Sequence, residues 1–428
     1  MTNLETHRRC LAISKCPWLI ACTAVCILLL FAPSSASAQT FAVLHNFTGG
    51  AGGAAPYAGV LMGRDGNLYG TTAAGGGGTC SAYYYFEPGC GTVYELNPSS
   101  QSFVTLWQFS GGSDGAYPEA GLVVGPGGAM YGSTGYGGNG CAGGCGTIFR
   151  ITPPATPPRT IKQAHWTVTI LQSFNGTDGQ EPTGNLAVDG SGNLYGATRQ
   201  GGPGGIVFKL SNLNGVWTLS DLHVFDGYDN FAMGGVILDT AGNVYGTSQG
   251  GAFGAGSVYQ LLADSDWQLN TLYSFTPYGD NGDDPVSGIT LDSSGNVYGS
   301  TAADGIGHGG TVFELSSGSW SFNLLDSLVG GGGPYYSNLV FDKAGNLYGA
   351  TTADGANGYG SVFKLTPSNG TWTYTSLHDF TGGSDGGLPI GTLALDADGN
   401  LYGTASRGGN DLSKCSGWGC GVVFKITP

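Results

Sequence analysis

GNLYG, first found at Gly66–Gly70, decides the fold of this chain, because close variants of it occur seven times. The copies are GNLYG at Gly66–Gly70, GAMYG at Gly128–Gly132, GNLYG at Gly192–Gly196, GNVYG at Gly242–Gly246, GNVYG at Gly295–Gly299, GNLYG at Gly345–Gly349 and GNLYG at Gly399–Gly403. Their tyrosines are 50 to 64 residues apart. A recurrence of this size is typical of repeat architectures, in which each unit buries its apolar face against its neighbours.

The sixth repeat shows most clearly how one unit is built. Alternating apolar residues and flanking turn residues predict four strands, at Ser337–Asp342, Leu347–Thr352, Ser361–Leu365 and Thr371–Phe380. A glycine-rich loop, Ala353–Gly360, joins the second strand to the third. Four antiparallel strands in about 50 residues have the size of a propeller blade.

The two ends of the chain predict a closed ring. A lone segment, Phe41–Phe47, matches the fourth-strand segments Leu222–Phe225 and Leu377–Phe380, and the chain stops after a third strand at Val422–Ile426. The first strand of the chain would therefore complete the last blade and remove the exposed sheet edges. We expect an all-β, seven-bladed propeller with four antiparallel strands per blade.

The recurring polar and aromatic residues have structural roles in this interpretation. The pattern D-x-x-G-N, as at Asp342–Asn346, favours a tight hairpin, because aspartate bonds its own backbone and glycine or asparagine accepts a positive φ. It lacks the full ligand set of a calcium loop. Tryptophans that open the fourth strands are expected to pack between blades, at Trp166, Trp217, Trp267, Trp320 and Trp372.

The first 38 residues are expected to be a signal peptide. A basic start is followed by an apolar run from Trp18 to Ala32, and Ala36-Ser37-Ala38 fits a small-residue cleavage site. Cleavage after Ala38 would leave residues 39–428 as a single propeller domain. We expect this protein to be secreted or periplasmic, with no membrane span after the signal is removed.

The charge of the mature chain limits its partners. Residues 39–428 hold 28 of the 29 acidic residues but 11 of the 14 basic ones, which gives a net charge of about −17. An acidic surface without a basic cluster repels phosphate backbones, so nucleic acid is not an expected partner. We expect a monomer.

Six of the ten cysteines remain after cleavage. They lie close together in pairs, and in each pair the second cysteine precedes a glycine that opens a strand. An even count in an exported chain predicts the disulfides Cys80–Cys90, Cys141–Cys145 and Cys415–Cys420.

The phrases D-x-x-G-N-[LV]-Y-G and G-[TS]-V-[FY]-[KE]-L, separated by a glycine-rich loop, resemble the GloVer tandem repeat. The resemblance covers Phe41–Pro428. It implies an exported, propeller-like bacterial protein of the kind described as "choice-of-anchor", and no activity that holds for the family in general. Many such proteins are said to end in an anchoring segment. This sequence shows none, so release is expected.

The candidate ligand-binding residues are aromatic and lie in or beside the cystine loops. The connectivity of a propeller places the loop between the second and third strands on the same face as the link between blades. The aromatic residues of these loops are Tyr83, Tyr84, Tyr85, Phe86, Tyr136 and Trp418. Rigid aromatic side chains suit flat ligand faces such as sugar rings, because little side-chain entropy is lost. The alternative is that they pack down over the blades.

The sequence therefore favours a binding or scaffold protein that recognises a glycan or another cell-envelope ligand through this face. Two alternatives remain: a polysaccharide lyase or glycosidase that uses acidic loop residues such as Asp283 and Asp284, and an inert structural surface protein. We expect no catalytic residue and no cofactor. Calcium is a further possibility, with Asp114, Asp178 and Asp385 as candidate ligands on the rim.

Overall fold

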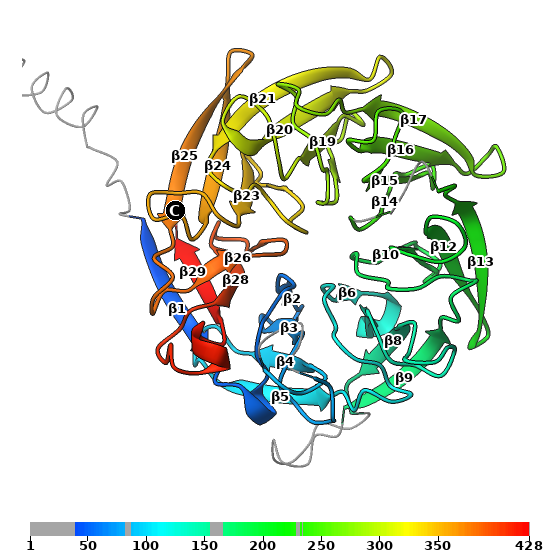
Figure 1. Ribbon diagram of the computed structural model, residues 1–428, viewed down its shortest axis with the longest axis vertical. Helices are drawn as coiled ribbons and strands as arrows, with labels where there is room; N and C mark the ends of the chain where they lie inside the picture. The colour runs from blue at the N-terminus through cyan, green and yellow to red at the C-terminus, as the bar shows by residue number, and fades with distance from the viewer. Residues whose placement is uncertain (1–38, 82–86, 155–165, 228–231, 233, 428) are drawn as a thin grey trace, which may run out of the picture. The chain divides into compact units, whose positions relative to one another are not determined.

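The computed structural model describes residues 39–81, 87–154, 166–227, 232 and 234–427. Among these residues the strands form seven antiparallel sheets, six of four strands and one of five, arranged as the blades of a ring (Figure 1). The predicted seven-bladed propeller is confirmed.

Each blade runs outwards from the axis in chain order. The first three blades are β2 (Leu61–Met62), β3 (Leu68–Thr72), β4 (Thr92–Leu96) and β5 (Phe103–Gln108); β6 (Val123–Val124), β7 (Met130–Thr134), β8 (Thr147–Thr152) and β9 (Thr167–Ser173); and β10 (Ala187–Val188), β11 (Leu194–Thr198), β12 (Ile206–Leu213) and β13 (Val216–Val224). The next three are β14 (Ile237–Leu238), β15 (Val244–Ser248), β16 (Ser257–Leu262) and β17 (Gln268–Ser274); β18 (Thr290–Leu291), β19 (Val297–Ser300), β20 (His308–Ser316) and β21 (Ser321–Val329); and β22 (Val340–Phe341), β23 (Leu347–Thr351), β24 (Ser361–Ser368) and β25 (Thr371–Asp379).

The last blade is completed by the start of the chain. It contains β26 (Gly387–Pro389), β27 (Ala394–Leu395), β28 (Leu401–Arg407), β29 (Val422–Thr427) and β1 (Thr40–Asn46). Strand β1 pairs antiparallel with β29, with Phe41 opposite Ile426 and Asn46 opposite Val422. Figure 1 shows the two strands side by side. The predicted closure of the ring by the N-terminal strand is confirmed.

The first strands are shorter than the sequence predicted. Six residues, Ser337–Asp342, were expected in the sixth blade, but only Val340 and Phe341 pair with the next strand. The preceding Asn338 lies at the axis of the ring, where it faces other blades instead of a ladder partner. Three short 3₁₀ turns complete the regular structure of the described residues: η1 (Gly50–Gly52), η2 (Pro126–Gly128) and η4 (Cys415–Gly417).

The D-x-x-G-N segments form the tight turns that were predicted. In the sixth blade, Asp342 Oδ1 accepts hydrogen bonds from the backbone N of Ala344 (2.8 Å) and of Asn346 (2.9 Å). Asp342 Oδ2 accepts from Tyr348 Oη at 3.0 Å. The tyrosine of the repeated phrase therefore stabilises the hairpin turn that precedes it by a hydrogen bond to the aspartate. The spacing of the repeats in the sequence did not predict this role.

The blades pack through aromatic side chains, as predicted for the tryptophans. Trp217 of the third blade lies against Tyr131 of the second, with ring centroids 6.0 Å apart, and Trp372 lies against Tyr298 at 6.4 Å. The second and third strands of each blade are almost wholly buried. Each blade therefore buries its faces against its neighbours, which is why the unit repeats.

Candidate functional site

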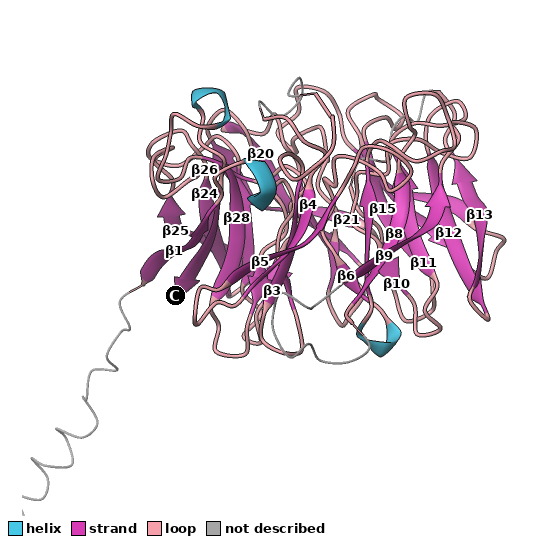
Figure 2. Ribbon diagram, turned by 90° about the horizontal axis from the view of Figure 1, so that it is seen from below, coloured by secondary structure: helices cyan, strands magenta, loops and turns pink. Residues whose placement is uncertain are grey.

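One face of the ring carries most of the long loops (Figure 2). Isolated bridges join the link between two blades to the loop between the second and third strands, for example Ala54 with Ala74 and Asp283 with Ala303. Both classes of loop therefore lie on the same face, which we call the loop-rich face. The disulfides Cys80–Cys90, Cys141–Cys145 and Cys415–Cys420 are present there, as predicted.

Backbone atoms and small side chains close the axis of the ring. A Cβ atom on Gly59 would lie 1.8 Å from the carbonyl oxygen of Thr392, and one on Gly288 would lie 2.4 Å from Asn338 Oδ1. Asn185 Oδ1 accepts a hydrogen bond from the backbone N of Gly121 at 2.7 Å. The space that remains has a volume of about 10 Å³, room for a single water-sized group.

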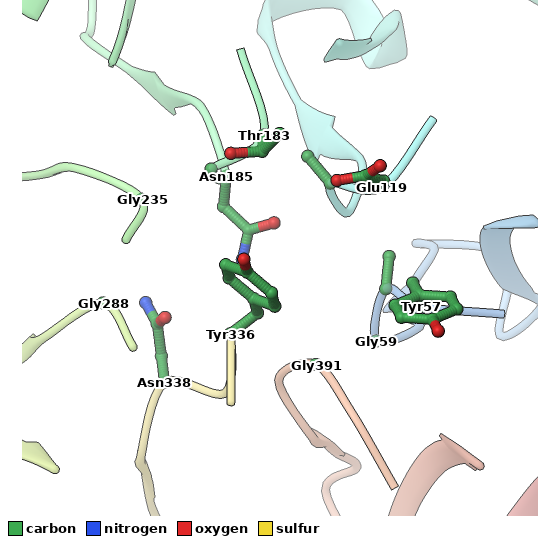
Figure 3. A pocket seen from close by; sticks show the side chains of 13 residues that line it. Tyr57, Gly59, Glu119, Thr183, Asn185, Gly235, Gly288, Tyr336, Asn338 and Gly391 are labelled. Atoms are coloured by element: carbon green, nitrogen blue, oxygen red, sulfur yellow. The ribbon is translucent and has the colours of Figure 1, made fainter. Parts of the chain in front are cut away.

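Side chains from different blades surround this space (Figure 3). We call the group Tyr57, Glu119, Thr183 and Tyr336 the axial mouth, because all four line the space and come from the first, second, third and sixth blades. Thr183 is 9% exposed. Its Oγ1 is buried and has no hydrogen-bond partner among the described residues.

The backbone that leads into this region is strained. Ala55, Tyr117, Glu181, Asp284 and Leu388 have φ between 52° and 56°, and each directly precedes a proline. Residues other than glycine rarely adopt this conformation, and proline further restricts the residue before it. Strain of this kind is concentrated at functional sites, so its repetition here indicates that the local geometry is fixed.

Glu119 lies close to two phenols of the axial mouth. Burial raises the pKa of Tyr336 to about 12, and the charge of Glu119 adds to this effect while Arg199 opposes it. Burial also raises the pKa of Tyr57, where Arg407 opposes and Glu119 again adds. Both phenols therefore stay protonated at neutral pH and can donate hydrogen bonds.

A second small cavity, also of about 10 Å³, adjoins the mouth. We call Tyr57, Arg407 and Trp418 the Trp418 shelf, since all three line this cavity and Tyr57 lines both cavities. The guanidinium of Arg407 lies 4.3 Å from the centroid of the Trp418 ring, a cation–π contact. The Cys415–Cys420 disulfide closes the loop that holds Trp418, and the indole is 48% exposed.

The predicted aromatic residues have different environments. Tyr83, Tyr84, Tyr85 and Phe86 lie outside the described residues. Tyr136 is partly buried: it meets Tyr117 edge to face at 5.7 Å, and its hydroxyl donates to Glu181 Oε1 at 3.1 Å. Trp418 is the described candidate with a large exposed surface.

The candidate calcium ligands take part in their own turns. Asp114 accepts from the backbone N of Ser110 at 3.0 Å, and Asp178 accepts from the backbone N of Asn175 at 2.7 Å. Asp385 accepts from the backbone N of Thr381 at 3.0 Å and lies 3.1 Å from a ring nitrogen of His378. Each carboxylate already accepts hydrogen bonds within its loop.

Among the acidic loop residues, the structure pairs Asp283 with Asp304, whereas the sequence suggested a pairing of Asp283 with Asp284. Burial, the charge of Asp304 and a hydrogen bond to it raise the pKa of Asp283 to about 6. Asp284 Oδ1 instead accepts from Gln249 Nε2 at 2.5 Å. A directly hydrogen-bonded carboxyl pair shares a proton, whereas glycosidases hold their two carboxyl groups about 5–10 Å apart.

Exposed apolar side chains also occur in loops, and at the end of strand β21, in blades that have no disulfide, a feature that the sequence interpretation missed. They are Phe253 (59% exposed), Tyr278 (94%), Ile306 (69%) and Val329 (77%). They belong to the fourth and fifth blades, whereas the disulfides lie in the seventh, first and second. Their signal in the sequence was weak, because each is an isolated apolar residue that precedes a glycine, which resembles ordinary loop composition.

The family model described as the Gloeobacter/Verrucomicrobia repeat matches residues 30–163, 159–337 and 290–428. No curated protein matches the chain by sequence. None of the described helices is long and apolar enough to cross a membrane.

Solved structures resemble the chain in fold. The hydrazine synthase of Kuenenia stuttgartiensis matches with a TM-score of 0.53 and 13% identity, over 82% of this chain and 93% of that chain. A gluconolactonase from Xanthomonas campestris matches with a TM-score of 0.41 and 12% identity, over 91% and 90% of the two chains. TolB from Acinetobacter baumannii matches with a TM-score of 0.40 and 12% identity, over 67% and 59%. At these identities the likeness concerns the fold alone.

Proposed function

The chain belongs to the Gloeobacter/Verrucomicrobia repeat family, and we propose that it is an exported binding protein that recognises a glycan of the cell envelope through its loop-rich face. The observation that carries this proposal is the Trp418 shelf. A half-exposed indole on a cystine loop, supported on one face by Arg407, is a flat and rigid surface. Such a surface binds the apolar face of a sugar ring at little cost in side-chain entropy.

The axial position of the shelf supports the proposal further. Tyr57 lines both the cavity of the shelf and the axial mouth, so the shelf lies next to a second polar group of side chains on the axis. Loops held by a rigid scaffold are the usual location of binding residues. The three disulfides favour a protein of an oxidising compartment, in agreement with export.

Binding of the mature protein to a panel of envelope oligosaccharides tests this function. Trp418→Ala is expected to weaken binding at least tenfold and to leave the melting temperature within about 2 °C, since nearly half of the indole is exposed. Trp372→Ala is the matched control, because this indole packs against Tyr298 of the neighbouring blade. It should lower the melting temperature and leave the affinity unchanged.

Absence of binding to every oligosaccharide would refute the proposal. A loss of stability in Trp418→Ala as large as in Trp372→Ala would show that the indole packs instead of binding. Export is tested separately, by sequencing the N-terminus of the processed protein, which is expected to begin at Gln39.

A further inference from the structure

A cavity of about 730 Å³ lies between the first and second blades. Its lining includes the turns that join β2 to β3 and β4 to β5 and the turn that joins β6 to β7. Because neighbouring strands of a blade run antiparallel, these turns lie on the face opposite the loop-rich face. Sites for small ligands typically have volumes of about 300–1,000 Å³, and this cavity is of that size.

The two blades that enclose the cavity depart from the repeated turn. In the other five blades the aspartate of D-x-x-G-N lies six residues before the tyrosine of the phrase, but glycine takes its place at Gly63 and Gly125. Gly63 lines the cavity and presents no side chain to it. The cavity therefore lies at a junction where both neighbouring repeats differ from the rest.

The second blade also carries a long connection on this face. Residues 153–166 join β8 to β9, whereas two residues join β12 to β13 in the next blade. Pro153, Pro154 and Trp166 are the described residues of this connection, and all three line the cavity. An insertion in one repeat of a rigid scaffold commonly serves the binding of a ligand.

The walls of the cavity are mainly apolar. The ring centroid of Trp166 lies 6.0 Å from that of Tyr69 across the junction of the blades, and Met130 is buried beside them. Val104 lies opposite Glu95, at a position of the fourth strand that Thr169 holds in the second blade. Aromatic and aliphatic walls of this kind favour a flat apolar ligand.

The polar part of the lining is a hydrogen-bonded network. Asn67 Nδ2 donates to Glu95 Oε1 at 2.7 Å and to Asp65 Oδ2 at 3.1 Å. Tyr69 Oη also donates to Asp65 Oδ2, at 2.7 Å. The donors of Asn67 and Tyr69 are thereby used, whereas a carboxylate accepts several hydrogen bonds and has capacity for more.

Glu95 is the carboxylate that gains most from a further donor. Burial raises the pKa of Glu95, and the charge of Asp65 adds to this effect. A hydrogen bond from a ligand would therefore stabilise a poorly solvated carboxylate. Arg64 lines the cavity as well, so a neutral donor fits this lining better than an ion.

We propose that this cavity binds a flat, uncharged aromatic molecule that donates a hydrogen bond to Glu95. The ring of the ligand would lie among Trp166, Val104 and Met130, and its N–H or O–H group would face the network. This site is separate from the glycan surface of the proposed function, because the Trp418 shelf lies on the opposite face. The propeller would then bind one ligand on each face.

The test uses the fluorescent probe N-phenyl-1-naphthylamine, which carries one N–H group and becomes bright in apolar surroundings. The mature protein is expected to bind it saturably, with a dissociation constant below about 100 μM. The competitor 1-phenoxynaphthalene has an oxygen in place of the N–H group and should bind about tenfold more weakly. Glu95→Lys should abolish this difference, because lysine holds the same position over Tyr195, Tyr348 and Tyr402 in other blades and accepts no hydrogen bond.

Two tryptophans provide a matched pair. Trp166→Ala is expected to weaken binding of the probe at least tenfold. Trp217→Ala is the control, since this indole also lies 6.0 Å from a tyrosine of the preceding blade. It should lower the melting temperature by a similar amount and leave the affinity unchanged, as should Trp418→Ala for the affinity. If Trp166→Ala fails to fold, Val104→Thr decides, because it places a hydroxyl in the wall at constant shape and should weaken binding severalfold.

Three results would overturn the proposal. The first is equal weakening by Trp166→Ala and Trp217→Ala, which would place the probe elsewhere on the protein. The second is equal affinity for the probe and 1-phenoxynaphthalene, which would remove the hydrogen bond to Glu95. The third is binding that appears only after residues 156–164 are replaced by a glycine–serine linker, which would show that the chain itself occupies the cavity. None of these results bears on the binding of oligosaccharides to the loop-rich face.

Discussion

Replacing Leu44 by alanine tests the closure of the ring, on which the loop-rich face depends. Leu44 is the buried leucine of β1, and it packs in a cluster that also contains Phe47, Tyr94 and Val423. Leu44 therefore packs the N-terminal strand against residues of both the last blade and the first. Strand β1 lies beside β29 but is separated from it by almost the whole chain, so no hairpin joins the two strands.

The expected cost follows from burial. Leu44 is 7% exposed, and truncation of a buried leucine to alanine costs about 2–5 kcal/mol. Near the middle of that range, about 3 kcal/mol, the opening of β1 alone becomes about 100-fold more frequent, since 1.4 kcal/mol is a factor of ten. Only the contacts of β1 must break for this opening, because a long link, residues 47–60, separates β1 from the first strand of the next blade.

Leu377→Ala is the matched control. Leu377 is 8% exposed at the corresponding position of β25, but a short turn connects β25 directly to β24. Hydrogen exchange followed by mass spectrometry should show about 100-fold faster exchange of the β29 amides that face β1 in Leu44→Ala. The β24 amides in Leu377→Ala should exchange less than tenfold faster. Equal acceleration in the two variants would refute the view that β1 closes the ring as a separable strand.

Three further outcomes are expected. Burial lowers the pKa of His45 to about 4, so the stability that the neutral imidazole contributes is complete above pH 6.5 and is lost as the pH falls towards 4. In urea titrations the free energy of unfolding should be about 2 kcal/mol lower at pH 4.5 than at pH 7, and His45→Phe should abolish this difference. Gly59→Ala should lower the melting temperature by several degrees in calorimetry, because its Cβ has no room at the axis, whereas Gly52→Ala, with nothing within 4 Å, should have little effect. The raised pKa of Asp283 means that its protonated form stabilises the fold, and this stabilisation is lost as the pH rises through about 6. Asp283→Asn should therefore be more stable than wild type in urea titrations at pH 8, by about 1 kcal/mol after a reduction for solvent screening. At pH 4 the substitution should give no such gain.

The sequence predicted those parts of the fold that every repeat must build alike. Seven copies of one phrase, a lone strand at one end and a missing strand at the other were enough to predict the ring. The hairpin role of Asp342 followed from local turn chemistry. The disulfide pairs followed from proximity in the chain, because each closes a single loop.

The candidate site was less predictable, because it depends on contacts between distant repeats. Arg407 and Trp418 lie near each other in sequence, yet only the path of the loop shows that the guanidinium covers one face of the indole. Glu119 lies just before the short first strand of the second blade, and only the closed axis brings it into one lining with Tyr57 and Tyr336 of other blades. The partner of Asp283 is Asp304, because the bridge between Asp283 and Ala303 brings two loops together.

The closed axis also explains why only a few side chains of each repeat are exposed to a ligand at the centre of the ring. The glycines at the crossing points, such as Gly59 and Gly391, cannot carry a side chain without clashing with a neighbouring blade. The second and third strands are buried and serve the packing of the blades. Two positions before Gly59 and Gly121 the chain carries Tyr57 and Glu119, and two positions before Asn338 it carries Tyr336; all three line the axial space. This position therefore differs in chemistry between blades although the repeated phrase is nearly constant, so the axis of the ring is the place where one repeat presents several kinds of side chain.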